Sequence, residues 1–328
     1  MRLELPGLFD LQVNGFGGVD FNDPDAARDG LLRAIGRIRS TGVTRFLPTL
    51  ITSSFDRFRR CARALVGLDH AAIAGLHMEG PYIAADDGPR GAHPRQHVRS
   101  ASLDDFERRQ DAADGRIRLV TLAPEVPGAI KLTECLVDRG VRVAIGHTAA
   151  GAQQIRDAVA AGATLSTHLG NGCAQELPRH PNLLWEQLAS DELHASLIVD
   201  GHHLPPATVK AMVRAKTAER TILVTDAIAA AGCVPGRYEL NGEPVELSAD
   251  GRVSPPGKPW LAGSAITLDQ AVANAVNYAG ISLESAWAMA STQPARYLGM
   301  PTAGHVIADW DTAACRLTIL EVLDSRAP

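Results

Sequence analysis

Short apolar runs recur along the chain and alternate with longer segments whose apolar residues fall at helical spacing. Turn residues bound each run, which is typical of strands in a parallel sheet. Eight such runs occur, at residues 8–14, 43–51, 72–79, 117–125, 141–147, 163–168, 194–200 and 221–226. The amphipathic segments between them include residues 25–40, 56–68, 149–162 and 206–216. Eight alternations predict an α/β fold, a (β/α)8 barrel of the TIM type, rather than a doubly wound sheet.

The pattern changes after the eighth run. Residues 236–263 alternate polar and apolar positions around "NG" and "DG", so we expect a hairpin insertion there. Three helices are then predicted, at residues 265–279, 283–291 and 294–299. The barrel is therefore expected to occupy residues 7–300, and two terminal strands are predicted within residues 301–328.

Composition and charge exclude several classes of partner. The 328 residues are 45% hydrophobic and carry a formal net charge of -5, so no basic field suits a nucleic acid. Glu4 and Asp10 interrupt the N-terminus where a signal peptide needs an apolar core, and no apolar stretch is long enough to span a bilayer. The five cysteines are scattered singly, which suits a reducing compartment. We expect a cytoplasmic protein without nucleic-acid or membrane partners.

Polar residues gather where the predicted strands end. In a (β/α)8 barrel the C-terminal strand ends surround one mouth, so residues far apart in sequence converge there. Three of them, Glu79, His147 and His168, combine one carboxylate with two imidazoles. This is a known ligand type for catalytic zinc, and it leaves one position open for water. A single histidine at a strand end is more often structural, but three such residues around one mouth predict a metal site.

Asp226, in "LVTDA", allows two interpretations. It can be a general base that takes a proton from water, or a structural carboxylate that caps the following helix. Spacing alone does not decide between them, but a position at the end of the eighth strand favours catalysis. Asp200 ends the seventh run, and we expect it to orient a loop or a neighbouring side chain.

Consecutive motifs carry a resemblance to a known family. From about residue 7 to residue 310, "DLQVNGFGGVDF", "LHMEGPYI", "RGAHPRQHV", "GHT", "THLGN", "VDGHH", "LVTDAIAAAG" and "LAGSAITL" follow one another. In this order the chain resembles the N-acetylglucosamine-6-phosphate deacetylases of the amidohydrolase superfamily. The resemblance implies a metal-dependent hydrolase that removes acetate from an amino sugar phosphate, most simply N-acetylglucosamine 6-phosphate.

The resemblance also assigns roles to residues. It implies that Glu79, His147 and His168 hold one divalent metal, expected to be Zn²⁺ with Fe²⁺, Co²⁺ or Mn²⁺ as alternatives. Asp226 becomes the acid/base residue, and His93 of "GAH" orients or polarises the substrate amide. The expected substrate contacts are Asn171, Gly172, Arg179 and His203. Gln12 and Asn14 occupy the positions where other amidohydrolases have the ligands of a second metal.

The matches at Arg179 and at Gln12 and Asn14 predict the oligomeric state and the number of metal ions. Arg179 matches a phosphate-binding arginine that a neighbouring subunit supplies in some members, so a homodimer is expected. Gln12 and Asn14 stand where many amidohydrolases have an H-x-H pair, and both are poor zinc ligands. We therefore expect one metal ion per site.

The chain departs from the family pattern at two places. Members begin with about fifty residues that form half of a small β-sandwich, whereas here the first barrel strand begins within ten residues of Met1. A reduced or missing sandwich is therefore expected, with residues 1–6 and 301–328 as its remnant. The two terminal strands pack either with "MRLEL" or with the 236–263 hairpin. The second departure is "GCAQELPRHPNLLW", which follows "THLGN" and changes the expected phosphate contacts.

Other functions stay open because the altered loop can accept a different substrate. The alternatives are an amidohydrolase acting on another N-acyl or cyclic amide, and a non-catalytic protein that binds a sugar phosphate. The metal ligands cannot separate the first alternative from a deacetylase. An intact ligand set and Asp226 argue against the second, since a pure binder needs no water-activating metal.

Overall fold

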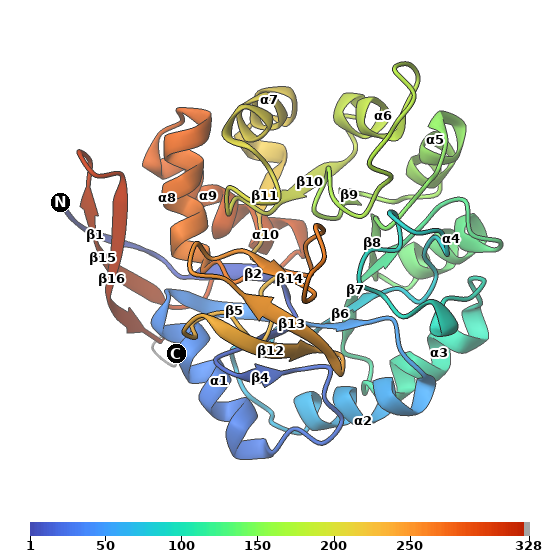
Figure 1. Ribbon diagram of the computed structural model, residues 1–328, viewed down its shortest axis with the longest axis horizontal. Helices are drawn as coiled ribbons and strands as arrows, with labels where there is room; N and C mark the ends of the chain where they lie inside the picture. The colour runs from blue at the N-terminus through green and yellow to red at the C-terminus, as the bar shows by residue number, and fades with distance from the viewer. Residues whose placement is uncertain (325–328) are drawn as a thin grey trace.

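The computed structural model describes residues 1–324 of the chain. Eight parallel strands form one sheet, in the order β11-β10-β9-β8-β7-β6-β5-β2 (Figure 1). They are β2 (Leu8–Val13), β5 (Val43–Ile51), β6 (Leu76–Glu79), β7 (Ile117–Leu122), β8 (Arg142–Ile145), β9 (Leu165–Ser166), β10 (His194–Leu197) and β11 (Thr221–Leu223). Each is the strand expected from one apolar run, and the prediction of a TIM-type barrel is confirmed.

Contacts between the first strand and the end of the last one close the barrel. The amide N–H of Asn14 donates to the carbonyl of Ala227 at 2.7 Å, and that of Asp226 donates to the carbonyl of Gln12 at 3.0 Å. A parallel bridge also joins Val13 to Ala227. The closure therefore brings Asp226 beside Gln12 and Asn14 at the end of β2.

Ten α-helices are described, and those between successive strands cover the outside of the barrel (Figure 1). They are α1 (Arg28–Ser40), α2 (Phe55–Val66), α3 (Leu103–Ala112), α4 (Ala129–Asp138), α5 (Ala152–Ala160), α6 (Leu183–Ala189), α7 (Pro206–Lys216), α8 (Leu268–Ala279), α9 (Leu283–Ala290) and α10 (Thr292–Tyr297). Their apolar faces pack against the strands. On α1, for example, Leu31, Ile35 and Ile38 are buried while the arginines between them are not.

The barrel interior is apolar at one end and polar at the other. Phe9, Leu47 and Leu119 belong to a buried cluster inside the barrel, and Ala295 and Tyr297 of α10 join it. Titratable side chains such as Glu79 and Asp226 lie at the other end, where the strands open into the mouth. The interior is therefore a packed core with the site at its C-terminal end.

Three small antiparallel sheets accompany the barrel sheet, and the smallest pairs β3 (Gly15–Phe16) with β4 (Val19–Asp20). β1 (Arg2–Pro6) pairs with β15 (His305–Asp311), which pairs with β16 (Arg316–Leu323). The terminal strands thus pack with the "MRLEL" segment, which was one of the two expected arrangements. The last residues of the predicted terminal segment, 325–328, lie outside the described residues.

The predicted 236–263 hairpin is present with a third strand added. β12 (Gly236–Leu240) pairs with β13 (Glu243–Leu247), which pairs with β14 (Val253–Ser254). Leu240 and Val245 share a buried cluster with Ile51 and Ile228, two residues at the barrel mouth. The insertion therefore packs over one side of the mouth.

Two findings bear on the expected environment of the protein. Across residues 1–324, none of the helices combines the length and apolar character needed to cross a bilayer. All five cysteines are free, and Cys61 is buried, where burial raises the pKa of its thiol to about 12. Cys61 therefore behaves as a small apolar side chain rather than a nucleophile.

Candidate metal centre and active site

Three predicted ligands meet at the mouth of the barrel. Glu79 is the last residue of β6, and His147 and His168 each follow the end of their strand by two residues. Oε1 of Glu79 lies 3.2 Å from Nε2 of His147 and 3.1 Å from Nε2 of His168. The exposed fractions of the three residues are only 2%, 7% and 3%, in that order. One ligand atom from each residue lies within 4.8 Å of the others, as a shared metal ion requires.

The two imidazoles are presented through Nε2. Nδ1 of His147 donates to the carbonyl oxygen of Pro89 at 2.9 Å, so its Nε2 carries a lone pair. The Nε2 atoms of His147 and His168 are 3.2 Å apart. Burial favours a protonated Glu79, but the neighbouring His147 and His168 hold its pKa well below the ordinary value. The site thus places an anionic oxygen and imidazole nitrogens around one point, and this donor set fits a divalent cation.

Backbone conformation explains why the strands end before the polar residues. The apolar runs 141–147, 163–168 and 221–226 predict strands that continue to the last residue of each run, whereas β8, β9 and β11 end at Ile145, Ser166 and Leu223. His147, His168 and Asp226 have positive φ values of 51°, 30° and 51°.

A left-handed residue cannot continue a strand, and this conformation costs a non-glycine residue about 1–2 kcal/mol. Two metal-ligand candidates and the acid/base candidate therefore share an unfavourable backbone conformation. Strain of this kind concentrates at functional sites, where it aims side chains that a regular strand would direct elsewhere.

Asp226 is held by two side-chain amides. Its Oδ1 accepts hydrogen bonds from Nδ2 of Asn14 at 2.6 Å and from Nε2 of Gln12 at 3.1 Å. Burial, followed by the negative charge of Glu79, raises the pKa of Asp226 to about 6. A carboxyl group with a pKa near neutrality can both accept and return a proton. The amide contacts also show that Asp226 points to the mouth rather than capping a helix.

Gln12 has a role that the sequence did not indicate. Its Nε2 donates to Oε1 of Glu79 at 2.9 Å as well as to Asp226. From the sequence, Gln12 and Asn14 are recognisable only as poor metal ligands, because an amide at the end of the first strand gives no sign of its partners. The structure shows that both tie the first strand to the carboxylates of the site.

His93 enters the site from the loop after β6. Its Nε2 lies 3.7 Å from Oε2 of Glu79, and its ring centroid is 4.2 Å from that of His147. On the other side, Nδ1 of His93 lies 2.8 Å from Oγ1 of Thr52 and accepts from the Thr52 backbone N–H at 3.4 Å.

The protonation state of His93 follows from these contacts. Burial and then the charge of His147 lower the pKa of His93 well below its ordinary value, so the ring is neutral. Because Nδ1 accepts from Thr52, Nε2 carries the proton and can donate it into the site. A threonine after a strand has no distinctive sequence signal, so the role of Thr52 is evident only from the structure.

Asp200 positions His203. Oδ2 of Asp200 accepts from Nδ1 of His203 at 2.7 Å, and its Oδ1 accepts the backbone N–H groups of His202 and His203, both at 2.8 Å. Burial raises the pKa of Asp200, but the hydrogen bond and charge of His203 outweigh it, so that the net shift is downward. An anionic Asp200 fixes the His203 ring, as expected of a residue that orients a neighbour.

The remaining predicted substrate contacts lie on the loop between β9 and α6. Gly172 packs against the metal site, since a Cβ added to it would lie 3.0 Å from Nδ1 of His147 and 3.2 Å from Cε1 of His168. Nδ2 of Asn171 donates to the carbonyl oxygen of His168 at 3.2 Å. Arg179 is exposed, and within residues 1–324 it forms no hydrogen bond or salt bridge. Within a single chain, Arg179 therefore forms no hydrogen bond or salt bridge with the other candidate site residues.

Comparisons with known proteins identify related sequences. The family model described as "Amidohydrolase family" matches residues 4–316. The N-acetylglucosamine-6-phosphate deacetylase of Homo sapiens is 37% identical over 316 residues, covering 91% of this chain and 75% of the relative. The N-acetylgalactosamine-6-phosphate deacetylase of Escherichia coli O157:H7 is 35% identical over 307 residues, covering 91% and 79%.

Solved structures give the same result. A structure of an N-acetyl-D-glucosamine-6-phosphate deacetylase mutant from Mycobacterium smegmatis, in complex with N-acetyl-D-glucosamine-6-phosphate, matches with a TM-score of 0.90. The two sequences are 31% identical, and the match covers 98% of this chain and 86% of the other. The deacetylase from Thermotoga maritima matches with a TM-score of 0.85 at 26% identity, covering 98% and 87%.

Proposed function

Because this chain belongs to the amidohydrolase family and, within it, to the N-acetylglucosamine-6-phosphate deacetylase family, we propose that it hydrolyses the N-acetyl amide of N-acetylglucosamine 6-phosphate. The products are glucosamine 6-phosphate and acetate. The observation that carries the proposal is the meeting of Glu79, His147 and His168 within 4.8 Å, with Gln12 joining them to Asp226.

A divalent metal completes the proposed site. Glu79, His147 and His168 would hold it, and Zn²⁺ suits one carboxylate and two imidazoles best, with Fe²⁺, Co²⁺ and Mn²⁺ as alternatives. When bound, such an ion supplies activation of water and polarisation of the amide carbonyl. Gln12 and Asn14 donate hydrogen bonds through their amide nitrogens, and amide side chains are poor ligands for a second Zn²⁺ ion.

The side chains of this chain supply the proton transfers. Asp226 takes a proton from water as the water oxygen adds to the acetyl carbonyl carbon. The N–H at Nε2 of His93 donates to the carbonyl oxygen as negative charge develops on it. Asp226 then returns its proton to the amide nitrogen, the C–N bond breaks, and acetate and the free amine leave.

Substrate binding involves the loop residues and a second copy of the chain. The backbone N–H of Gly172, the side chain of Asn171 and His203 are proposed to contact the sugar phosphate, since the backbone N–H of Asn171 already donates to the carbonyl oxygen of His168 at 2.9 Å. Arg179 is exposed and unpaired in the described chain, which supports a role in the site of a neighbouring copy. We therefore propose a homodimer, located in the cytoplasm, in which each chain completes the phosphate contacts of the other.

A second candidate substrate differs at one sugar hydroxyl. The relative from Escherichia coli O157:H7 is named for N-acetylgalactosamine 6-phosphate, and its 35% identity is close to the 37% of the human N-acetylglucosamine-6-phosphate deacetylase. We prefer N-acetylglucosamine 6-phosphate as the substrate because more of the relatives are named for it.

A substrate panel tests the proposal. Amine release from N-acetylglucosamine 6-phosphate, N-acetylgalactosamine 6-phosphate and N-acetylglucosamine is measured side by side with metal-loaded protein. The first compound is expected to give the highest kcat/KM and the unphosphorylated sugar the lowest. Higher kcat/KM for the galacto compound would select the second candidate. Equal kcat/KM with and without phosphate would contradict the phosphate contacts of Arg179 and His203.

A further inference from the structure

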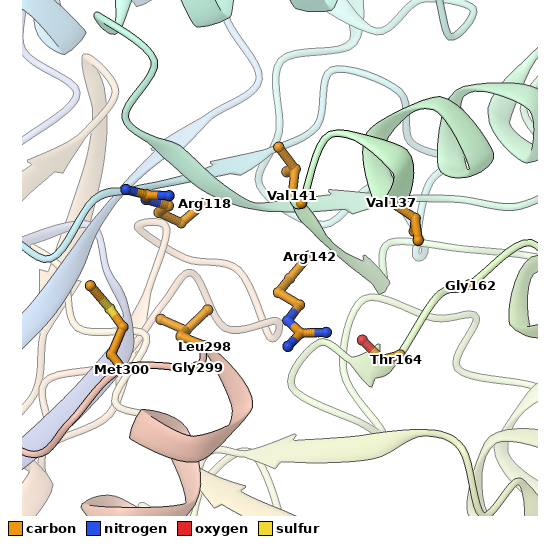
Figure 2. Close-up of a pocket in the computed structure, with 10 residues that line it drawn as sticks. Arg118, Val137, Val141, Arg142, Gly162, Thr164, Leu298, Gly299 and Met300 are labelled. Atoms are coloured by element: carbon orange, nitrogen blue, oxygen red, sulfur yellow. The ribbon is translucent and has the colours of Figure 1, made fainter.

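A cavity of about 600 Å³ lies at the opposite end of the barrel from the metal centre. Arg118, Arg142 and Thr164 line it near the starts of β7, β8 and β9, and Leu298 and Met300 line it just after α10 (Figure 2). None of these residues belongs to the site at the mouth. The volume lies within the range of pockets that hold small organic ligands.

The charged groups of this cavity are arginines without acidic partners. No aspartate or glutamate lines the cavity, and both Arg118 and Arg142 are exposed. In the part of the chain that the structure describes, neither guanidinium forms a hydrogen bond or salt bridge. Arg142 is instead supported by an aromatic ring, with its Cζ 5.4 Å from the centroid of Tyr297. Both guanidinium groups thus keep their N–H donors available to a ligand.

Apolar side chains also line the cavity, beside the two arginines. Val137, Val141, Leu298 and Met300 line the cavity, and Figure 2 shows the guanidinium of Arg142 directed between Leu298 and Thr164. A ligand that satisfies both kinds of surface needs a carbon skeleton and at least one oxyanion, because guanidinium groups pair with carboxylates and phosphates through two parallel hydrogen bonds.

We propose that this cavity binds a small organic oxyanion, either a phosphate ester or a carboxylate, independently of the substrate site. The two sites lie at opposite ends of the same strands. β8 begins at Arg142 and leads to His147, and Thr164 precedes β9, which leads to His168. At about 3.3 Å per residue, the five steps from Arg142 to His147 span roughly 16 Å, so a ligand in the cavity does not reach the metal centre.

The test uses two probes on the full-length, metal-loaded protein. Glucose 6-phosphate represents the phosphate esters and succinate the carboxylates, and titration calorimetry measures the affinity of each. Hydrogen exchange then locates binding, with added protection expected at residues 140–142 and 298–300. Protection with one probe identifies the oxyanion class. A binding signal confined to the mouth, or no protection of the cavity segments by either probe, overturns the proposal.

Matched variants separate the cavity from a general effect of charge. Arg142→Gln and, independently, Arg118→Gln should weaken the cavity binding by about tenfold, since each removes charge-assisted hydrogen bonds. Arg139→Gln removes the same charge from an arginine that pairs with Glu107 and does not line the cavity, so it should change affinity less than about twofold. All three variants should keep wild-type amine release. Equal weakening by Arg139→Gln would overturn the site.

Discussion

The hydroxyl oxygen of Thr52 lies 2.8 Å from Nδ1 of His93. Thr52 follows β5, and His93 lies on the loop after β6, so this contact joins two neighbouring connections at the barrel mouth. The contact keeps Nδ1 as an acceptor and directs the remaining N–H of the ring into the site. Thr52 is therefore a positioning residue for the proposed polarisation of the substrate amide.

Replacing Thr52 with valine should lower kcat about tenfold, because the isosteric side chain cannot donate to Nδ1. KM and metal content should stay near wild type, and Thr52→Ser should restore most of the rate. Steady-state kinetics combined with metal analysis checks this. A fall in metal content or in thermal stability without the split between kcat and KM would indicate a packing role instead.

Asp226→Asn should retain the metal and the fold but reduce kcat by about 10²–10⁴, the usual range for loss of an acid/base group. An asparagine Oδ1 can still accept from Gln12 and Asn14, so the local hydrogen bonds survive. Amine release and metal stoichiometry are measured on the same sample. A rate within threefold of wild type, on the order of 1 kcal/mol or less in activation free energy, would remove Asp226 from the acid/base role.

Gly172→Ala should weaken metal binding, since the new Cβ would lie 3.0 Å from Nδ1 of His147. Gly172 also has a φ of +58°, and an alanine there costs about 1–2 kcal/mol of stability from the backbone alone. Gly257→Ala is the matched control, because Gly257 has a φ of +71° but no atom within 4 Å of an added Cβ. Both variants should lose similar stability, but only Gly172→Ala should lose metal affinity. Equal metal affinity in the two variants would show that the loop at Gly172 can move to accommodate the added Cβ without displacing His147.

Asp10 should make the protein less stable as pH rises from about 4 to about 7. Burial raises the pKa of Asp10 from 3.8 to about 7, so the folded chain binds a proton that the unfolded chain has released over this range. The stabilisation is complete below 3.8 and is lost as pH rises through the folded pKa, by about 4 kcal/mol at most.

Asp10→Asn isolates this effect. An asparagine can donate to Oγ1 of Thr225, whose hydroxyl can then turn to the carbonyl oxygen of Gln12, 3.3 Å away. Denaturant unfolding of both proteins at several pH values should show Asp10→Asn gaining stability relative to wild type as pH rises. A difference in stability that does not change with pH would mean that Asp10 titrates normally.

The sequence predicted the barrel because its strands are buried on both faces. The run 43–51 became β5 with the same bounds, and 206–216 became α7, since burial and helical periodicity both leave a local pattern. The bounds of β8, β9 and β11 were wrong at their C-terminal ends. Positive φ at His147, His168 and Asp226 is set by the packing of the mouth, and no local pattern announces it.

The metal-ligand candidates were accessible to prediction because strand ends of a barrel share one mouth. Contacts that depend on side-chain direction were not. Gln12 reaches Glu79 across the barrel, and Thr52 reaches His93 between two loops. Such pairs are set by tertiary geometry. The partner of Arg179 also cannot be derived from the fold of one chain, because Arg179 is exposed and its contacts depend on the molecule that binds there.

Metal-dependent turnover tests the central claim most directly. The protein is stripped with a chelator, and amine release from N-acetylglucosamine 6-phosphate is measured before and after titration with Zn²⁺. The site of Glu79, His147 and His168 predicts no release from stripped protein and full recovery at one ion per chain. Undiminished release from metal-free protein, or one bound ion without any release, would contradict it.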